Sequence, residues 1–265
     1  MSESRTVPGI LYLVPTPLDF GCPADEQGSV ERLLPEETLA VAASLTHWIS
    51  ENAKSTRAFL KRVAAVRGLA APIQDHRISE LPRQAHKKGD HLPGPDNDAL
   101  ASALLAPALQ GQPIGLVSEA GMPAIADPGS SVVRAAHAAG IEVRPLTGPV
   151  SLVLALAASG LNGQDFAFVG YVPQDAQQRV KRLKELESLA LRTGQTQMLI
   201  ETPYRNAALL QALLQTLQPN TRLAVCCGLG LPGQSVRSDR VGAWRARSLA
   251  SALPLSLPAV FLLGR

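Results

Sequence analysis

The chain has 265 residues, of which 46% are hydrophobic, 18% charged and only 4% aromatic. This length allows two compact lobes, and an apolar fraction near the globular average excludes a disordered chain. The 21 glycines and 21 prolines show no fixed period, which excludes a collagen-like chain, and a formal net charge of +3 is too small to indicate nucleic-acid binding by itself. A core built mainly from Ala, Leu and Val favours helices packed on buried strands over an aromatic-rich β-sandwich.

Short apolar runs alternate with amphipathic segments along the chain. The runs predict buried strands over residues 10–14, 46–49, 114–117, 142–145, 166–169, 197–200, 223–227 and 259–263. Helical periodicity predicts helices over residues 34–45, 54–67, 98–110, 130–139, 149–159, 174–192, 206–217 and 241–252. Because no hairpin signal interrupts the alternation, we expect an α/β fold built on parallel strands.

Two segments depart from this alternation. Residues 72–95 have no apolar periodicity and are rich in charged residues, Pro and Gly. This composition predicts a long surface loop. Gly228, Gly230 and Gly233 spell G-x-G-x-x-G directly after a predicted strand. A dinucleotide phosphate loop is not favoured there, because residues 234–240 are polar and irregular and too little chain remains for a following βαβ unit.

The cysteines and the amino-terminal residues bear on the compartment. Cys22, Cys226 and Cys227 form neither an even disulfide set nor a Cys-x-x-Cys metal spacing. The apolar run at residues 10–14 is too short for a signal peptide or a membrane span. We therefore expect a cytoplasmic protein that does not associate with membranes.

Three histidines, His76, His86 and His91, fall in the predicted surface loop. They have no spacing typical of metal ligands. We expect them to be exposed to solvent and the protein to bind no metal.

Residues 118–129 form the most informative loop. They follow a predicted strand, and the carboxyl ends of parallel strands are where open α/β sheets bind ligands. Its glycines allow close backbone approach to a ligand, and Ser118 and Glu119 offer acceptors for a hydroxyl or an ammonium group. We interpret the loop as a cradle for a small molecule. Asp127 has a second interpretation as the N-cap of the next helix.

Two further loops follow predicted strands. Residues 147–151 lead into an apolar helix whose first N–H groups create a polar site, although Thr147 could instead cap that helix. Glu201 and Arg205 stand four positions apart, which favours an ion pair between them.

Basic residues cluster in the first half of the chain. Lys54, Arg57, Lys61 and Arg62 fall on one face of the helix predicted over residues 54–67. The cluster continues with Arg67, Arg77, Arg83, Lys87 and Lys88. An RNA backbone would suit this stripe, and a solvated helix face is the alternative.

Sequence blocks over nearly the whole chain resemble the tetrapyrrole methylase superfamily, specifically its branch of ribosomal RNA small-subunit methyltransferases. In order, the blocks are residues 11–17, 117–123, 127–129, 148–149, 159–161, 170–173 and 201–205. The resemblance implies a methyltransferase that uses S-adenosylmethionine, and a homodimer. It also implies two α/β lobes, residues 1–120 on the acceptor side and residues 121–265, with the cofactor in the cleft between them.

The resemblance further implies site residues. The candidates for binding the cofactor are Pro15, Ser118, Glu119, Ala120, Gly121, Met122, Thr147, Ser151 and Tyr171. The candidates for binding an RNA substrate are Lys54, Arg57 and Lys61. The acceptor implied is a ribose hydroxyl of the small-subunit ribosomal RNA.

The acceptor side departs from the branch. Where its members have Glu-Asp-Thr-Arg, this chain has Glu51, Asn52, Ala53 and Lys54, which keeps only the first acid. Glu51 is therefore the candidate to take the proton from an acceptor hydroxyl, with a helix-start acid as the alternative. Because the cofactor blocks match better than the acceptor block, two other functions stay open: methylation of a tetrapyrrole-like small molecule, and cofactor binding without catalysis.

Overall fold

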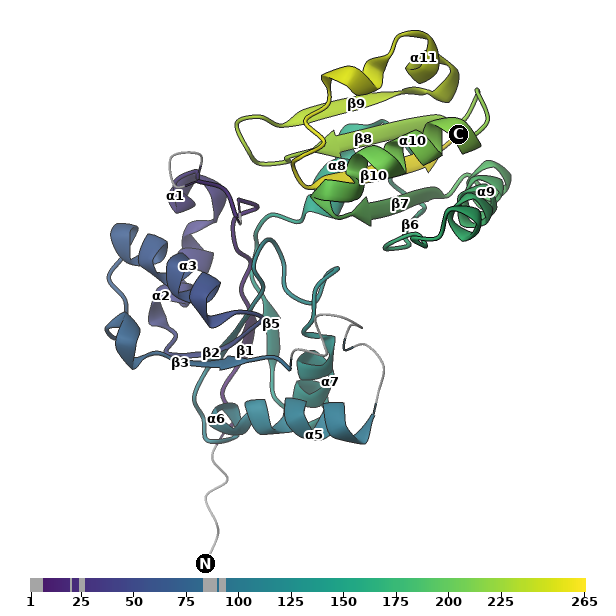
Figure 1. Ribbon diagram of the computed structural model, residues 1–265. Coiled ribbons are helices and arrows are strands. Elements are labelled where there is room, and N and C mark those ends of the chain that lie inside the picture. The colour runs from purple at the N-terminus through teal and green to yellow at the C-terminus, as the bar shows by residue number, and fades with distance from the viewer. Residues whose placement is uncertain (1–6, 20, 24–26, 83–89, 91–93) are drawn as a thin grey trace, which may run out of the picture. The chain divides into compact units, whose positions relative to one another are not determined.

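The computed structural model describes residues 7–19, 21–23, 27–82, 90 and 94–265 (Figure 1). Contacts divide the chain into two compact units, Met1–Pro149 and Val150–Arg265. The boundary expected between residues 120 and 121 lies inside the first unit. The reason is that strand Val143–Pro145 pairs with the first strand of the chain, so residues after 121 complete the first sheet.

The first unit contains a five-stranded parallel sheet. Its order is β3-β2-β4-β1-β5, with β1 at Leu11–Leu13, β2 at His47–Ser50, β3 at Arg77–Glu80, β4 at Ile114–Val117 and β5 at Val143–Pro145. Four of these strands confirm the sequence prediction. The fifth, β3, lies in the segment predicted to be a loop. It is an edge strand with mostly exposed residues, so it lacks the apolar pattern of a buried strand.

Helices cover both faces of this sheet. They are α1 (Val30–Leu33), α2 (Glu36–Ser44) and α3 (Ala53–Val66) on one face, and α5 (Pro95–Leu104), α6 (Ala106–Leu109) and α7 (Ser130–Ala138) on the other. The strands serve two cores because neighbouring side chains point to opposite faces. In β2, Trp48 packs with Leu60 of α3, whereas Ile49 packs with Leu105 beside α5.

The second unit contains a mixed sheet. Its order is β6-β7-β10-β8-β9, with β6 at Phe166–Phe168, β7 at Thr196–Glu201, β8 at Arg222–Cys227, β9 at Ser235–Arg240 and β10 at Ala259–Gly264. Only β6 and β7 are parallel; the other three pairings are antiparallel. The expectation of parallel strands without hairpins is therefore wrong for this unit, since β8 and β9 form a hairpin.

The strand β9 escaped prediction because it carries almost no apolar side chains. Its residues are polar except for Val236, and none is fully buried. The three glycines of G-x-G-x-x-G lie in the β8–β9 connection, where Gly228 and Gly230 adopt φ of 59° and 84°. The glycines therefore form a hairpin loop with no helix after it, which agrees with the rejection of a phosphate loop.

Helices cover both faces of the sheet in the second unit. Helix α8 (Ser151–Ser159) packs on one face, and α9 (Ala176–Thr193), α10 (Asn206–Thr216) and α11 (Val241–Ala246) pack on the other. The predicted helix over residues 241–252 is divided into α11 and a short 3₁₀ turn, Leu249–Ala252. Among the described residues, no helix combines the length and the apolar character that a membrane span requires.

Candidate functional site

The loops that follow β1, β4 and β5 contact one another at the carboxyl edge of the first sheet. Thr16 and Gly121 exchange two backbone hydrogen bonds of 2.9 and 3.0 Å, and Thr16 Oγ1 donates to the Ser118 carbonyl at 3.3 Å. A Cβ atom on Gly148 would come within 2.2 Å of Pro15 Cγ, so only glycine fits beside that ring. The seven cofactor candidates of the first unit thus lie on three joined loops. These seven residues are Pro15, Ser118, Glu119, Ala120, Gly121, Met122 and Thr147.

The backbone of the central loop, residues 118–129, adopts an unfavourable conformation at two alanines. Ala124 and Ala126 both have φ of 64°, and Gly121 has φ of 76°. Positive φ costs a non-glycine residue on the order of 1 kcal/mol or more, and such residues gather at functional sites. The surrounding contacts therefore force this loop into one shape.

The N-terminus of α7 is capped by Asp90, not by Asp127. Asp90 accepts hydrogen bonds from the backbone N–H groups of Gly129 and Ser131 at 2.9 and 3.0 Å, and from the hydroxyls of Ser130 and Ser131. Burial alone would raise the pKa of Asp90, but these hydrogen bonds outweigh it and lower the pKa. The capping interpretation of Asp127 is therefore wrong, and its carboxyl group is left for another role.

Three carboxyl groups gather beside this loop. Glu51 follows β2, Glu119 follows β4, and Asp127 lies near the end of the central loop. Glu51 Oε2 accepts a hydrogen bond of 3.0 Å from the Glu119 backbone N–H, and Glu119 Oε1 accepts one of 3.0 Å from Asn52 Nδ2. The structure thus brings Glu51 next to the predicted cofactor loop.

Asp127 has a strongly shifted pKa. Burial, followed by the negative charge of Glu51, raises its pKa from 3.8 to about 7; Glu119 adds a smaller contribution. The Ser118 hydroxyl opposes the shift but does not cancel it. This group was missed from the sequence because Asp127 followed by Pro128 matches a helix start, and burial and neighbouring charge are not visible in that pattern.

Asn52 has a clear structural role in α3. It is the N-cap residue, and its side chain accepts a hydrogen bond of 2.9 Å from the Lys54 N–H. The Ala53 N–H donates to Glu80 Oε1 at 2.7 Å. The start of α3 is therefore satisfied by Asn52 and Glu80, so the interpretation of Glu51 as the helix-start acid is not supported.

The basic stripe is only partly present. Lys54, Arg57 and Lys61 are exposed on α3, and none of them forms an ion pair with another described residue. Arg62 instead makes two hydrogen bonds of 2.8 Å to the buried Asp19 carboxylate. Arg67 pairs with Glu36, and Arg77 is exposed on β3. Arg83, Lys87 and Lys88 lie outside the described residues.

The expectation that the loop histidines are exposed is wrong for His76. Its side chain is buried; Nδ1 accepts from Trp48 Nε1 at 3.1 Å, and Nε2 lies 3.1 Å from the Ala71 carbonyl oxygen. His86 and His91 lie outside the described residues. Within the part of the chain that the structure describes, no cluster of His, Cys, Asp or Glu could hold a metal ion.

Ser151 and Tyr171 belong to the second unit. Ser151 is the first residue of α8, whose N-cap Val150 supplies no side-chain hydrogen bond, and Thr147 is not that cap. Tyr171 is 57% exposed. Glu201 and Arg205 form the predicted ion pair at 2.7 Å, so this part of the prediction is confirmed. The roles of Ser151 and Tyr171 in cofactor binding stay predictions.

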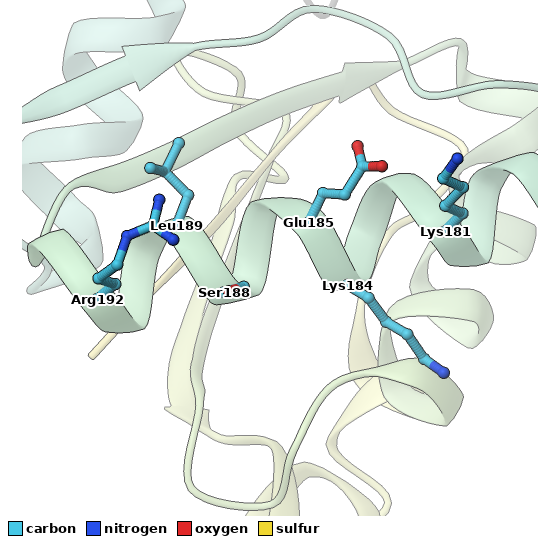
Figure 2. A pocket seen from close by; sticks show the side chains of 6 residues that line it. All are labelled: Lys181, Lys184, Glu185, Ser188, Leu189 and Arg192. Carbon is cyan, nitrogen blue, oxygen red and sulfur yellow. The ribbon is translucent and has the colours of Figure 1, made fainter.

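A shallow pocket on α9 carries basic side chains that the sequence analysis did not single out. It is lined by Lys181, Lys184, Glu185, Ser188, Leu189 and Arg192. Figure 2 shows Lys181 and Glu185 extending to one side of the helix and Lys184 to the other. Because the cations do not converge, we interpret this surface as a solvated helix face.

A comparison with protein-family models shows to which family the chain belongs. Residues 52–243 match the model of the Tetrapyrrole (Corrin/Porphyrin) Methylases. The chain belongs to this family. Solved structures agree on the fold: the methyltransferase CobJ has a TM-score of 0.56 at 18% identity, covering 97% of this chain and 94% of its own. Uroporphyrin-III-C-methyltransferase from Thermus thermophilus has a TM-score of 0.50 at 21% identity, covering 97% and 92%.

Curated relatives carry the name of one branch of the tetrapyrrole methylase family. A Ribosomal RNA small subunit methyltransferase I of Vibrio cholerae is 31% identical over 225 residues, covering 82% of this chain and 65% of the relative. One of Xylella fastidiosa is 33% identical over 181 residues, covering 68% and 55%. The chain thus matches between about half and two thirds of the length of these relatives.

Proposed function

We propose that this tetrapyrrole methylase family member transfers a methyl group from S-adenosylmethionine to RNA, at a ribose hydroxyl of the small-subunit ribosomal RNA. The methyl donor is the one that family members use, and the names of the curated relatives give small-subunit ribosomal RNA as the substrate. The ribose hydroxyl is the acceptor that the sequence resemblance implies. The observation that carries the proposal is the joined set of loops at the carboxyl edge of the first sheet, which contains seven of the nine predicted cofactor residues.

The residues of these loops fit such a cofactor. Gly121 and Gly148 let the backbones of neighbouring loops approach closely, since a Cβ atom at Gly148 would collide with Pro15. The Ser118 side chain is only 5% exposed and its hydroxyl interacts with the Asp127 carboxyl, so two polar side chains stand at this loop. When bound, S-adenosylmethionine supplies an electrophilic methyl group. The loops would contribute by fixing its orientation, since positioning is a large part of the rate of a displacement.

Incubation with labelled S-adenosylmethionine tests this function. We expect label to appear in small-subunit ribosomal RNA taken from cells that lack the protein, and not in RNA from cells that contain it. Label found only in a metabolite extract would instead support a small-molecule methyltransferase. Cofactor binding without labelling of either fraction would support a protein that has lost catalysis.

The exposed cations of α3 support the RNA part of the proposal. Changing Lys54, Arg57 and Lys61 together to Gln should weaken RNA binding and flatten its dependence on salt, because each lost phosphate contact lowers the slope of log K against log salt by about 1. The measurement is RNA affinity over a range of salt concentrations.

The matched control removes the same number of positive charges elsewhere. Lys181, Lys184 and Arg192 of α9 can be changed together to Gln. An equal loss of affinity in both triple variants would mean that overall charge, rather than the α3 surface, binds RNA.

A homodimer and a cytoplasmic location are part of the proposal. Large apolar side chains of the second unit stand exposed on α8 and β6, with Val153 56% and Phe166 46% accessible, and a second copy of the chain would cover such groups.

The cysteines support the cytoplasmic location. Cys226 and Cys227 are buried and not in a disulfide, which suits a reducing compartment.

A further inference from the structure

The side chain of Asn52 contacts both α3 and the central loop. Its Oδ1 atom accepts a hydrogen bond of 2.9 Å from the Lys54 backbone N–H, as the N-cap of α3. Its Nδ2 atom donates a hydrogen bond of 3.0 Å to Glu119 Oε1. Because an amide group has one donor end and one acceptor end, the bond from Lys54 fixes which end faces Glu119. The central loop therefore receives a hydrogen-bond donor from the start of α3.

The backbone of Asn52 is held from both sides. Its N–H group donates to Ser50 Oγ at 2.8 Å, and its carbonyl accepts from the Thr56 N–H at 3.1 Å. The Thr56 hydroxyl in turn donates to Ser50 Oγ at 2.7 Å, and both of these side chains are buried. Ser50 ends β2, where it pairs with Val117 of β4. The amide group of Asn52 is therefore fixed relative to the strand that leads into the central loop.

Glu119 is held by two hydrogen bonds to residues that follow β2. Its backbone N–H donates to Glu51 Oε2 at 3.0 Å, and its Oε1 atom accepts from Asn52. Among the described residues, no donor bonds to its second carboxylate oxygen, Oε2, and Glu119 is only half-buried. An ionised carboxylate oxygen only accepts hydrogen bonds, so Oε2 suits a hydroxyl or an ammonium group of a bound molecule. S-adenosylmethionine carries both kinds of group.

Helix capping does not account for the donor end of Asn52. An N-cap needs only an acceptor, and serine or aspartate caps a helix about as well as asparagine. Within the part of the chain that the structure describes, Glu119 alone accepts from Asn52 Nδ2. A carboxylate in place of this amide group would meet the Glu119 carboxylate with the same charge. The choice of an amide at this position therefore serves Glu119.

We propose that Asn52 is a positioning residue for the cofactor: its amide group orients the Glu119 carboxylate, whose second oxygen accepts a hydrogen bond from a hydroxyl or ammonium group of S-adenosylmethionine. The inference rests on the proposed function. Asn52 stands at a place where the chain departs from the branch it resembles, so this departure serves cofactor binding and is not a loss of the site.

The first experiment removes the donor and keeps the cap. The serine hydroxyl of Asn52→Ser can cap α3 but is too short to reach Glu119. Calorimetric titration of the full chain with S-adenosylmethionine should give a Kd about tenfold higher than in the wild type, because a hydrogen bond to a charged group typically contributes at least that factor. In methyl transfer, KM for the cofactor should rise and kcat should change little. An unchanged Kd, or a loss confined to kcat, would overturn the inference.

A matched control weakens the start of α3 from the other side. Glu80→Ala removes the hydrogen bond of 2.7 Å from the Ala53 N–H and leaves the contact between Asn52 and Glu119 in place. Its Kd for S-adenosylmethionine should equal that of the wild type. A Kd raised as much as by Asn52→Ser would mean that α3 as a whole supports the site, which would overturn the role of the Asn52 amide.

The second experiment exchanges the two groups. Asn52→Asp keeps the cap but sets two carboxylates against each other, so it should weaken cofactor binding more than Asn52→Ser does. Glu119→Gln should also weaken binding, because the oxygen of the new amide faces Asn52 and its N–H groups replace the acceptor. In the double variant the new amide donates to the new carboxylate and keeps its oxygen for the cofactor. Its affinity should exceed that of either single variant, and losses that add would overturn the inference.

These measurements separate the inference from the proposed function. A wild type that binds S-adenosylmethionine, beside an Asn52→Ser variant that binds it equally well, would overturn the inference alone. A wild type that gives no heat with S-adenosylmethionine and labels no RNA would contradict the proposed function and, with it, the inference.

Discussion

Replacing Arg62 with Met should destabilise the first unit by about 3–5 kcal/mol, the usual cost of leaving one member of a buried ion pair without its partner. Arg62 makes two hydrogen bonds to Asp19, whose side chain is 5% exposed, and a third to the Gly28 carbonyl. Met fills a similar volume, so the expected loss comes from the uncompensated charge of Asp19 and not from a cavity.

The free energy of unfolding can be measured separately in the two units. The chain has two tryptophans, Trp48 in the first unit and Trp244 in the second, and both are buried. In a Trp244→Phe background, denaturant unfolding followed by fluorescence reports on the first unit. Adding Asp19→Asn to Arg62→Met should recover most of the loss, and Arg57→Met on the exposed face should change little. An Arg62→Met protein as stable as the wild type would show that Asp19 does not depend on this pair.

Replacing Asp127 with Asn should stabilise the first unit at pH 8, on the order of 3 kcal/mol, and change little at pH 4. The folded state raises the pKa of Asp127 from 3.8 to about 7, so the folded protein binds this proton more tightly than the unfolded chain. The stability that the proton contributes is complete below pH 4 and is lost as the pH rises through about 7. Each pKa unit corresponds to about 1.4 kcal/mol, reduced here because Asp127 is only partly buried.

The measurement compares wild type and Asp127→Asn by the same Trp48 fluorescence at several pH values. Asp75→Asn serves as the control because Asp75 is exposed in the same unit. A difference in unfolding free energy that stays constant from pH 4 to pH 8 would contradict the shifted pKa.

The sequence predicted the parallel sheet of the first unit well because its inner strands are continuous apolar runs. The strand at Ile114–Val117 is buried at every residue, and a helical pattern follows it. Two edge strands were missed: β3 and β9 are mostly polar as well as exposed, so hydrophobic periodicity does not mark them, whereas the apolar residues of the edge strand β6 did. The antiparallel pairing of β10 with β7 and β8 was also missed, since a buried apolar run carries no information about strand direction.

The site could be predicted only in part, for a related reason. Gly121 and Ser118 follow a strand, and that position in the sequence points to the sheet edge. Asp90, and not Asp127, caps α7 through a contact with Gly129 across 39 residues of chain. Local sequence preferences cannot reveal such a contact. Arg62 shares a helix face with three exposed cations in the sequence, yet its pairing with Asp19 removes it from that stripe.

Cys226 and Cys227 give the second unit a built-in reporter of its own opening. Neighbours on β8, they pack into different cores on opposite faces of the sheet, and burial raises their pKa to about 12 and about 11. Thiols in this condition resist alkylation while the strand stays paired. The rate at which a thiol reagent modifies them therefore measures how often β8 separates from β10, and the two cysteines distinguish which layer of helices lifts first.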